Sequence, residues 1–101
     1  MDKLKVIKSF LKGINKTIVN RGKRIHDNTI LEINATNDTQ YNILVPSESS
    51  DEEYSVTIDF ILEYEDINAF CPCYYFDEYG DCKHVVASIL TLQESFKKST
   101  V

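Results

Sequence analysis

Apolar residues recur every three or four positions near the start of the chain, which is the spacing of one face of an amphipathic helix. The stripe consists of Leu4, Ile7, Leu11 and Ile14. We expect this helix to end or bend at Gly13. A second helix is predicted from about Thr17 to His26, weakened by Gly22 and stopped at Asp27-Asn28. His26 suits the helix dipole there, and we assign it no role in a site.

Apolar and polar residues then alternate, which is the pattern of strands with one buried face. The alternation occurs in residues 30–36 and 54–62, and residues 40–45 are expected to form a strand between them. The sequence Asn37-Asp38-Thr39 is typical of a hairpin turn, and the polar, acidic residues 46–53 indicate a longer loop. Because short connections join consecutive strands, we predict an antiparallel meander over residues 30–62.

The last periodic stretch runs from Lys83 to about Lys97 and predicts a third helix. Its apolar stripe consists of Val85, Ile89, Leu92 and Phe96. This stripe needs an apolar partner, and the predicted sheet provides one. We therefore predict an α+β fold with a small three-stranded antiparallel sheet, N-terminal helices and a C-terminal helix, in which residues 1–101 form one domain. Domains of this size often need a metal ion or disulfides for stability.

The net charge of −5 hides an asymmetry along the chain. Residues 1–26 carry a net charge of +7, whereas residues 27–101 carry −12. The basic residues of the first segment are Lys3, Lys5, Lys8, Lys12, Lys16, Arg21, Lys23 and Arg24. They are candidates for contacts with nucleic-acid phosphates. A solvated helix face has the same composition, and the pI of 4.9 is low for a nucleic-acid-binding protein.

All three cysteines and one of the two histidines lie in the stretch CPCYYFDEYGDCKH, residues 71–84. The spacing Cys71-x-Cys73-x8-Cys82-x-His84 gives four potential ligands as two close pairs. Structural Zn²⁺ takes four thiolate or imidazole ligands in a tetrahedron, whereas a catalytic zinc keeps one position open. The pattern therefore favours a structural zinc ion that helps a small domain to fold.

Other interpretations of the cysteines are open but fit the spacing less well. A disulfide between Cys71 and Cys73 would close a very tight ring, and redox dithiols usually have the spacing Cys-x-x-Cys. Cys82 and His84 could act as a nucleophile and its base, but the other two cysteines would then have no role. Iron–sulfur ligation and buried cysteines without a metal are the remaining alternatives.

The motif Cys-x-Cys-x8-Cys-x-His, with CKH followed at once by the apolar stretch VVASILTL, resembles the SWIM zinc finger. The upstream stretch NRGKRI is similar to the Arg-Gly helix in the form of this family that accompanies bacterial SWI/SNF-type helicases. The resemblance extends over about residues 14–95, and residues 71–90 are its specific part. In this chain a proline lies between the first two cysteines, and the loop between the ligand pairs is acidic.

The resemblance implies zinc as the cofactor and Cys71, Cys73, Cys82 and His84 as its ligands. It implies a module that binds DNA or protein as an accessory domain of an ATP-dependent SWI/SNF-type helicase. A free-standing protein-interaction domain that does not bind nucleic acid is the alternative. An enzyme that uses the metal or Cys82 would need an open coordination position.

Several function classes are disfavoured by what the sequence lacks. It contains no Gly-x-x-x-x-Gly-Lys-[Ser/Thr] phosphate-binding loop, and 101 residues are too few for a helicase motor. We therefore expect no enzyme activity and no small-molecule substrate. No apolar run approaches the roughly 20 residues that cross a bilayer, and the lysine-rich N-terminus does not resemble a signal peptide. We expect a cytoplasmic protein without a membrane partner.

Overall fold

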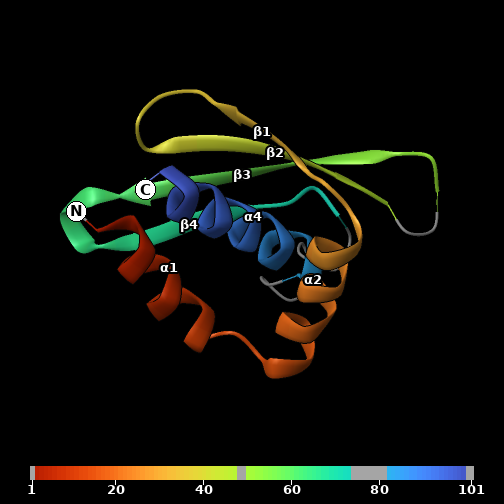
Figure 1. The fold of residues 1–101 in the computed structure, drawn as a ribbon, viewed down its shortest axis with the longest axis horizontal. Helices are drawn as coiled ribbons and strands as arrows, with labels where there is room; N and C mark the ends of the chain where they lie inside the picture. The colour runs from red at the N-terminus through yellow and green to blue at the C-terminus, as the bar shows by residue number, and fades with distance from the viewer. Residues whose placement is uncertain (1, 48–49, 74–81, 100–101) are drawn as a thin grey trace.

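The computed structural model describes residues 2–47, 50–73 and 82–99, whose arrangement is shown in Figure 1. Its elements are, in chain order, α1 (Lys3–Lys12), α2 (Lys16–Asn28), β1 (Glu32–Ala35), β2 (Gln40–Pro46), β3 (Glu53–Ile61), the 3-10 helix η1 (Leu62–Tyr64), β4 (Asp66–Phe70) and α4 (Lys83–Ser99). The predicted α+β class is confirmed. Among the described residues, no helix combines the length and the apolar character that crossing a bilayer requires.

Short polar side chains begin the first two helices. The carboxylate of Asp2 accepts hydrogen bonds from two backbone N–H groups in the first turn of α1, and the side-chain oxygen of Asn15 accepts one in α2. Such caps stabilise a helix because its first N–H groups have no partner within the helix. Gly13 ends α1, as predicted, whereas α2 continues to Asn28, two residues beyond the predicted end.

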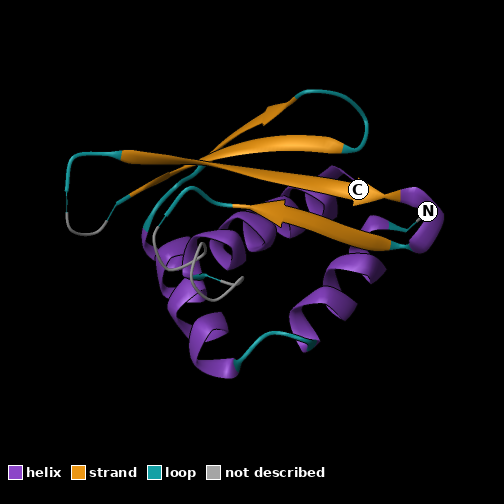
Figure 2. Ribbon diagram, turned by 180° about the vertical axis from the view of Figure 1, so that it is seen from behind, coloured by secondary structure: helices purple, strands orange, loops and turns teal. Residues whose placement is uncertain are grey.

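The strands form one antiparallel sheet in the order β1-β2-β3-β4, which confirms the meander (Figure 2). The predicted number of three strands is wrong, because residues 66–70 form a fourth strand paired with β3. In β4 only Ile67 and Ala69 point into the protein, while Phe70 is 55% exposed. Two inward positions are too few to give a recognisable alternation in the sequence.

The helices cover one face of the sheet, as Figures 1 and 2 show from opposite sides. Helix α4 packs against β2 and β3, α1 packs against β4 and α4, and α2 packs against α4. The fully buried side chains between the two layers include Ile7, Ile43, Val45, Val56, Ile58, Ile89 and Leu92. The apolar stripes of α1 and α4 thus have the partner that the sequence required.

Helices α2 and α4 are in close contact at Gly22. A Cβ atom at this position would lie 2.5 Å from the Cβ of Val86 and 2.9 Å from the carbonyl oxygen of Lys83. Such distances leave no room for a side chain. We expected Gly22 only to weaken the helix, but the structure shows that its missing side chain lets the two helices approach each other.

Candidate metal centre

The four predicted ligands come together where the sheet leads into α4. Cys71 and Cys73 follow β4, Cys82 immediately precedes α4, and His84 is the second residue of α4. All four side chains are buried, with exposed fractions of 1 to 6%. Their sulfur and nitrogen ligand atoms all lie within 4.8 Å of one another. The loop between the pairs, residues 74–81, with the acids noted above, lies outside the described residues.

This set of donors fits a tetrahedral metal ion. Metal–sulfur bonds of about 2.3 Å in a tetrahedron place neighbouring ligand atoms roughly 3.5–3.8 Å apart. The Sγ atom of Cys71 and the Nδ1 atom of His84 are 3.7 Å apart, which falls in that range. Three thiolates and one imidazole suit a soft or borderline metal ion and not Mg²⁺ or Ca²⁺, which prefer oxygen ligands. The cluster could therefore hold a transition-metal ion.

The pKa values of the Cys71 and Cys82 thiols are shifted in opposite directions. A hydrogen bond to Cys82, together with burial, raises the pKa of Cys71. The same hydrogen bond, with a further contribution from His84, lowers the pKa of Cys82 despite its burial. The cluster therefore favours a thiolate at Cys82, whereas Cys71 keeps its proton. A metal ion that binds both sulfurs must displace that proton, so metal affinity falls as the pH falls.

The imidazole of His84 is oriented by its neighbours. Its ring lies 4.7 Å from the ring of Tyr54 on β3, with an angle of 46° between the planes. The next three residues of α4 are buried, and the hydroxyl of Ser88 donates a 2.8 Å hydrogen bond to the His84 carbonyl oxygen. Because α4 is packed on all sides here, His84 is presented to the cysteines by a rigid helix.

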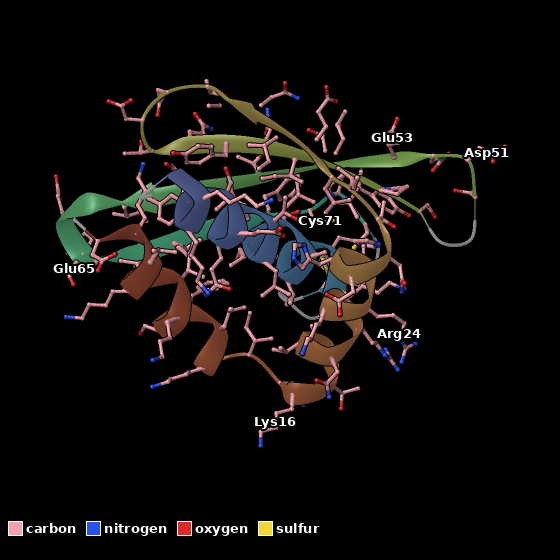
Figure 3. All side chains as sticks on the ribbon, in the orientation of Figure 1. Lys16, Arg24, Asp51, Glu53, Glu65 and Cys71 are labelled. Carbon is pink, nitrogen blue, oxygen red and sulfur yellow. The ribbon has the colours of Figure 1, made fainter. Side chains whose placement is uncertain are left out.

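The predicted basic residues divide into two groups. The ammonium group of Lys3 donates hydrogen bonds to the Tyr41 hydroxyl, at 2.9 Å, and to the carbonyl oxygen of Asp38. It also lies 5.3 Å from the ring centres of both Tyr41 and Phe96, so its charge is held within the fold. The exposed members are Lys5, Lys8, Lys12, Lys16, Arg21, Lys23 and Arg24. In Figure 3, Lys16 and Arg24 extend from the helices away from the sheet.

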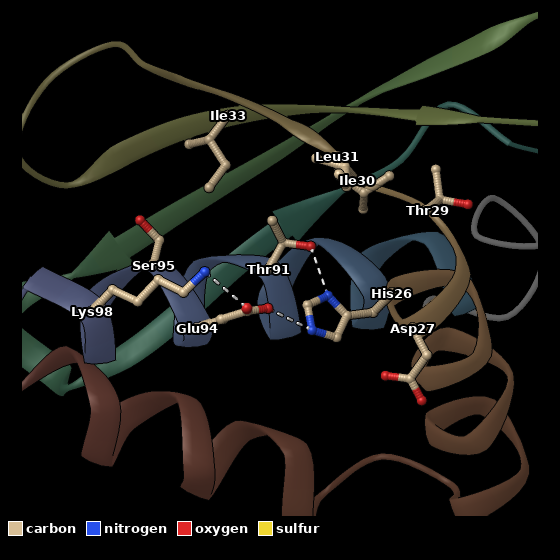
Figure 4. A pocket seen from close by; sticks show the side chains of 10 residues that line it. All are labelled: His26, Asp27, Thr29, Ile30, Leu31, Ile33, Thr91, Glu94, Ser95 and Lys98. Carbon is tan, nitrogen blue, oxygen red and sulfur yellow. Dashed lines mark hydrogen bonds and ion pairs between the residues drawn. The ribbon is translucent and has the colours of Figure 1, made fainter.

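His26 connects α2 to α4, a contact that the sequence analysis missed. Its Nε2 atom lies 3.0 Å from a carboxylate oxygen of Glu94, and its Nδ1 atom lies 3.2 Å from the hydroxyl oxygen of Thr91 (Figure 4). The Thr91 hydroxyl donates to the Ala87 carbonyl oxygen, so toward His26 it can only accept. Both ring nitrogens thus have an oxygen partner on α4, and His26 joins the end of α2 to the middle of α4. Because Glu94 is 68 positions away, no local pattern could reveal this pair.

Comparisons with protein-family models, with curated proteins and with solved structures find no match. The class of this protein is therefore defined by its own fold and site. It is an α+β domain with a meander of four strands and a buried cluster of three cysteines and one histidine that could hold a metal ion.

Proposed function

We propose that this protein is a non-catalytic, zinc-stabilised binding module of the SWIM type that contacts DNA through its helices. The observation that carries the proposal is the buried cluster of Cys71, Cys73, Cys82 and His84. Four protein donors fill the tetrahedral shell of a zinc ion, so such an ion has no open position for a substrate. Its role is then to stabilise the fold.

A zinc ion in this cluster would join the end of β4 to the start of α4. Structural zinc in small domains provides about 10–16 kcal/mol of apparent binding energy, which becomes folding energy where the unfolded chain has no site. A domain of 101 residues has a small core, so a contribution of this size is large compared with its expected total stability.

The exposed basic side chains of α1 and α2 form a basic helical face, and they support DNA as its ligand. None of the seven exposed residues named above lies on a strand, whereas the sequence from Asp27 to Cys82 contains no lysine or arginine. Basic and acidic surfaces are therefore separated, and phosphates would approach from the side of the helices. The motif resemblance makes an ATP-dependent SWI/SNF-type helicase the proposed host of this module.

The zinc part of the proposal is tested by mass spectrometry under native conditions. We expect one zinc ion per chain in the protein as purified, and loss of the ion in Cys73→Ser. Ser9→Ala is a matched control, because this exposed residue is remote in sequence from the cluster and should leave the stoichiometry unchanged. A Cys73→Ser protein with one bound zinc ion would contradict the proposed ligand set.

The DNA part is tested by titration of labelled single- and double-stranded DNA at two salt concentrations. Charge reversal at Lys12 or Arg24 should weaken binding and reduce its salt dependence, because each side chain would neutralise about one phosphate. Lys97→Glu makes the same change in charge near the far end of α4 and should have less effect. Absence of binding even at low salt would exclude DNA.

A protein partner is the second candidate function. The sheet favours it, because its strands contain acidic residues but no lysine or arginine. Such a surface repels phosphates and attracts basic segments of other proteins. In that case the module would dock on its own helicase motor or on a separate protein. The zinc ion would stabilise the fold in the same way under either function.

A further inference from the structure

The two edges of the sheet differ in how they are covered. Strand β4 forms one edge, and α1 packs against it. Strand β1 forms the other edge and pairs only with β2 among the described strands. An open edge can pair with an extended segment of another chain, and natural proteins often block such edges with lysine, proline or a bulge. The sequence of β1 contains neither lysine nor proline.

The register of the hairpin shows which backbone groups of β1 face outward. The N–H of Thr36 donates to the carbonyl oxygen of Gln40, so this pair is hydrogen-bonded to β2. Bonded and non-bonded pairs alternate along an antiparallel ladder. The pairs of Ile33 with Ile43 and of Ala35 with Tyr41 are therefore non-bonded. The N–H and C=O groups of Ile33 and Ala35 consequently point away from β2, toward the open edge.

A groove of about 580 Å³ lies beneath this same edge, between the start of β1 and helices α2 and α4 (Figure 4). Its upper wall is apolar and is formed by Ile30, Leu31 and Ile33, and Ile30 is fully exposed. The opposite wall includes Thr91, Ser95 and the ion pairs that Glu94 makes with His26 and Lys98. Side chains of directly paired residues lie on the same face of a sheet. A residue paired with Ile33 would therefore project its side chain over the groove.

The charge of the opposite sheet face indicates the chemistry of the added strand. The alternation along the strands places four acidic residues on this face: Glu32, Glu53, Asp59 and Asp66. No strand residue carries a positive charge. Glu32 belongs to β1 itself and would be a direct neighbour of the added strand. A second copy of this chain would bring the same acidic sheet and a net charge of −5, which disfavours self-association.

We propose that the open edge of β1 and the groove beneath it bind an extended basic segment of a partner protein as a fifth strand. In this segment apolar side chains alternate with lysine or arginine. The apolar side chains enter the groove beside Ile33, and the basic ones lie over the acidic face beside Glu32. Backbone hydrogen bonds to Ile33 and Ala35 provide affinity, and the alternation provides specificity. This surface is separate from the basic helical face assigned to DNA.

The proposal is tested with a short synthetic peptide in which valine and lysine alternate, with a valine–glutamate peptide as its control. NMR spectra of the backbone amides of the full chain should show binding of the basic peptide. The chemical-shift changes should be confined to residues 30–36 and the residues that line the groove. The acidic peptide should not bind. Equal binding of both peptides, or shift changes centred on β4, would overturn the proposal.

Two variants test the edge itself. Ala35→Pro removes an outward N–H without removing a ladder bond, so the fold should persist and the affinity should fall about tenfold. Glu32→Lys should weaken binding about two- to fivefold. Glu63→Lys makes the same change in charge on η1, away from β1, and should bind as the parent does. Parent-like affinity in both edge variants would overturn the proposal, and Glu32→Lys provides this test alone if Ala35→Pro does not fold.

Two further measurements separate this proposal from its alternatives. Glu32→Lys should bind DNA as the parent does, because Glu32 lies on β1 and the residues proposed to contact DNA lie on α1 and α2. The outcome of the peptide experiment therefore does not depend on whether the protein binds DNA. Sedimentation of the parent alone should show no association that depends on β1. A dimer that Ala35→Pro disrupts would show that a second copy occupies the edge, and would overturn the proposed partner.

Discussion

The start of α4 lies against three cysteines, whereas its last turns pack among aromatic rings. At the start, the buried donors Cys82 and His84 face Cys71 and Cys73, and a metal ion would join them. At the other end, the ring of Phe96 lies 5.6 Å from Tyr41 and 6.0 Å from Phe60, with the Lys3 ammonium group above these rings. With a metal ion in the cluster, the start of the helix would be held through that ion, whereas its end is held by the chain alone. Stability should be distributed unevenly along α4.

Removal of a bound metal ion is expected to have the largest effect on the difference in stability between the two ends of α4. Chelation, or Cys73→Ala, would remove most of the roughly 10–16 kcal/mol that a structural zinc ion can provide. Hydrogen exchange should show that protection is lost first at residues 71–73 and in the first turns of α4, and later near Phe96. Uniform loss of protection along α4 would show that its two ends do not differ in their dependence on the metal.

Truncation of the aromatic end should have the next largest effect. Because Phe96 is only partly buried, Phe96→Ala should lower the free energy of unfolding by about 2–4 kcal/mol, at or below the usual range for buried phenylalanine. Metal stoichiometry should not change. Tyr64→Ala is the control, because this ring is 76% exposed and its removal should change stability little. Denaturant unfolding monitored by circular dichroism measures both variants.

The contact between α2 and α4 can be tested with the two glycines of the helical region. Gly22→Ala should destabilise the protein by about 1–3 kcal/mol, because the new methyl group overlaps Val86. Gly13→Ala is a matched control, since a Cβ there would meet only the carbonyl oxygen of Phe10, at 3.6 Å. Val86→Ala removes the Cγ1 atom from this overlap but keeps the Cβ atom, so in a double-mutant cycle it should restore only a small part of the stability of Gly22→Ala. Additive effects would show that the two residues do not share this contact.

The smallest expected effect concerns Glu94 and its dependence on pH. Lys98, and to a lesser extent His26, lower the pKa of this carboxyl group. A lowered pKa in the folded state gives stability that is present above the unfolded pKa of about 4.3 and is lost as the pH falls through the folded value. The thermal midpoint of the parent should therefore exceed that of Glu94→Gln near neutral pH and approach it in acid. A difference that grows on acidification would contradict this sign.

Much of the fold follows from local patterns in the sequence. The apolar stripes predict α1 and α4, alternation predicts β1 and β3, and the turn at residues 37–39 predicts the hairpin that leads into β2, because each pattern is distinctive over the residues that it covers. Strand β4 was missed because only two of its residues point inward. The four residues of the cysteine–histidine cluster were recognisable because they form two close pairs of potential metal ligands along the chain.

The other features that sequence analysis missed depend on contacts between distant segments. The sequence groups Lys3 with the other basic residues of the first segment. In the structure, its ammonium group instead lies against aromatic rings from β2, β3 and α4. Likewise, the pairing of His26 with Glu94 and the packing of Gly22 on Val86 depend on where α4 crosses α2. A periodic pattern within one segment does not predict how two helices are placed relative to each other.

The missing side chain at Gly22 also determines how the two helices are aligned along their axes. One turn of an α-helix advances about 5.4 Å. A slide of α2 by one turn in either direction would bring Ile18 or Ile25 against Val86, where even a methyl group does not fit. The contact of Gly22 with Val86 therefore fixes the distance from Arg21 and Arg24 to the cysteine cluster. A ligand bound by these arginines would lie in one defined position relative to that cluster.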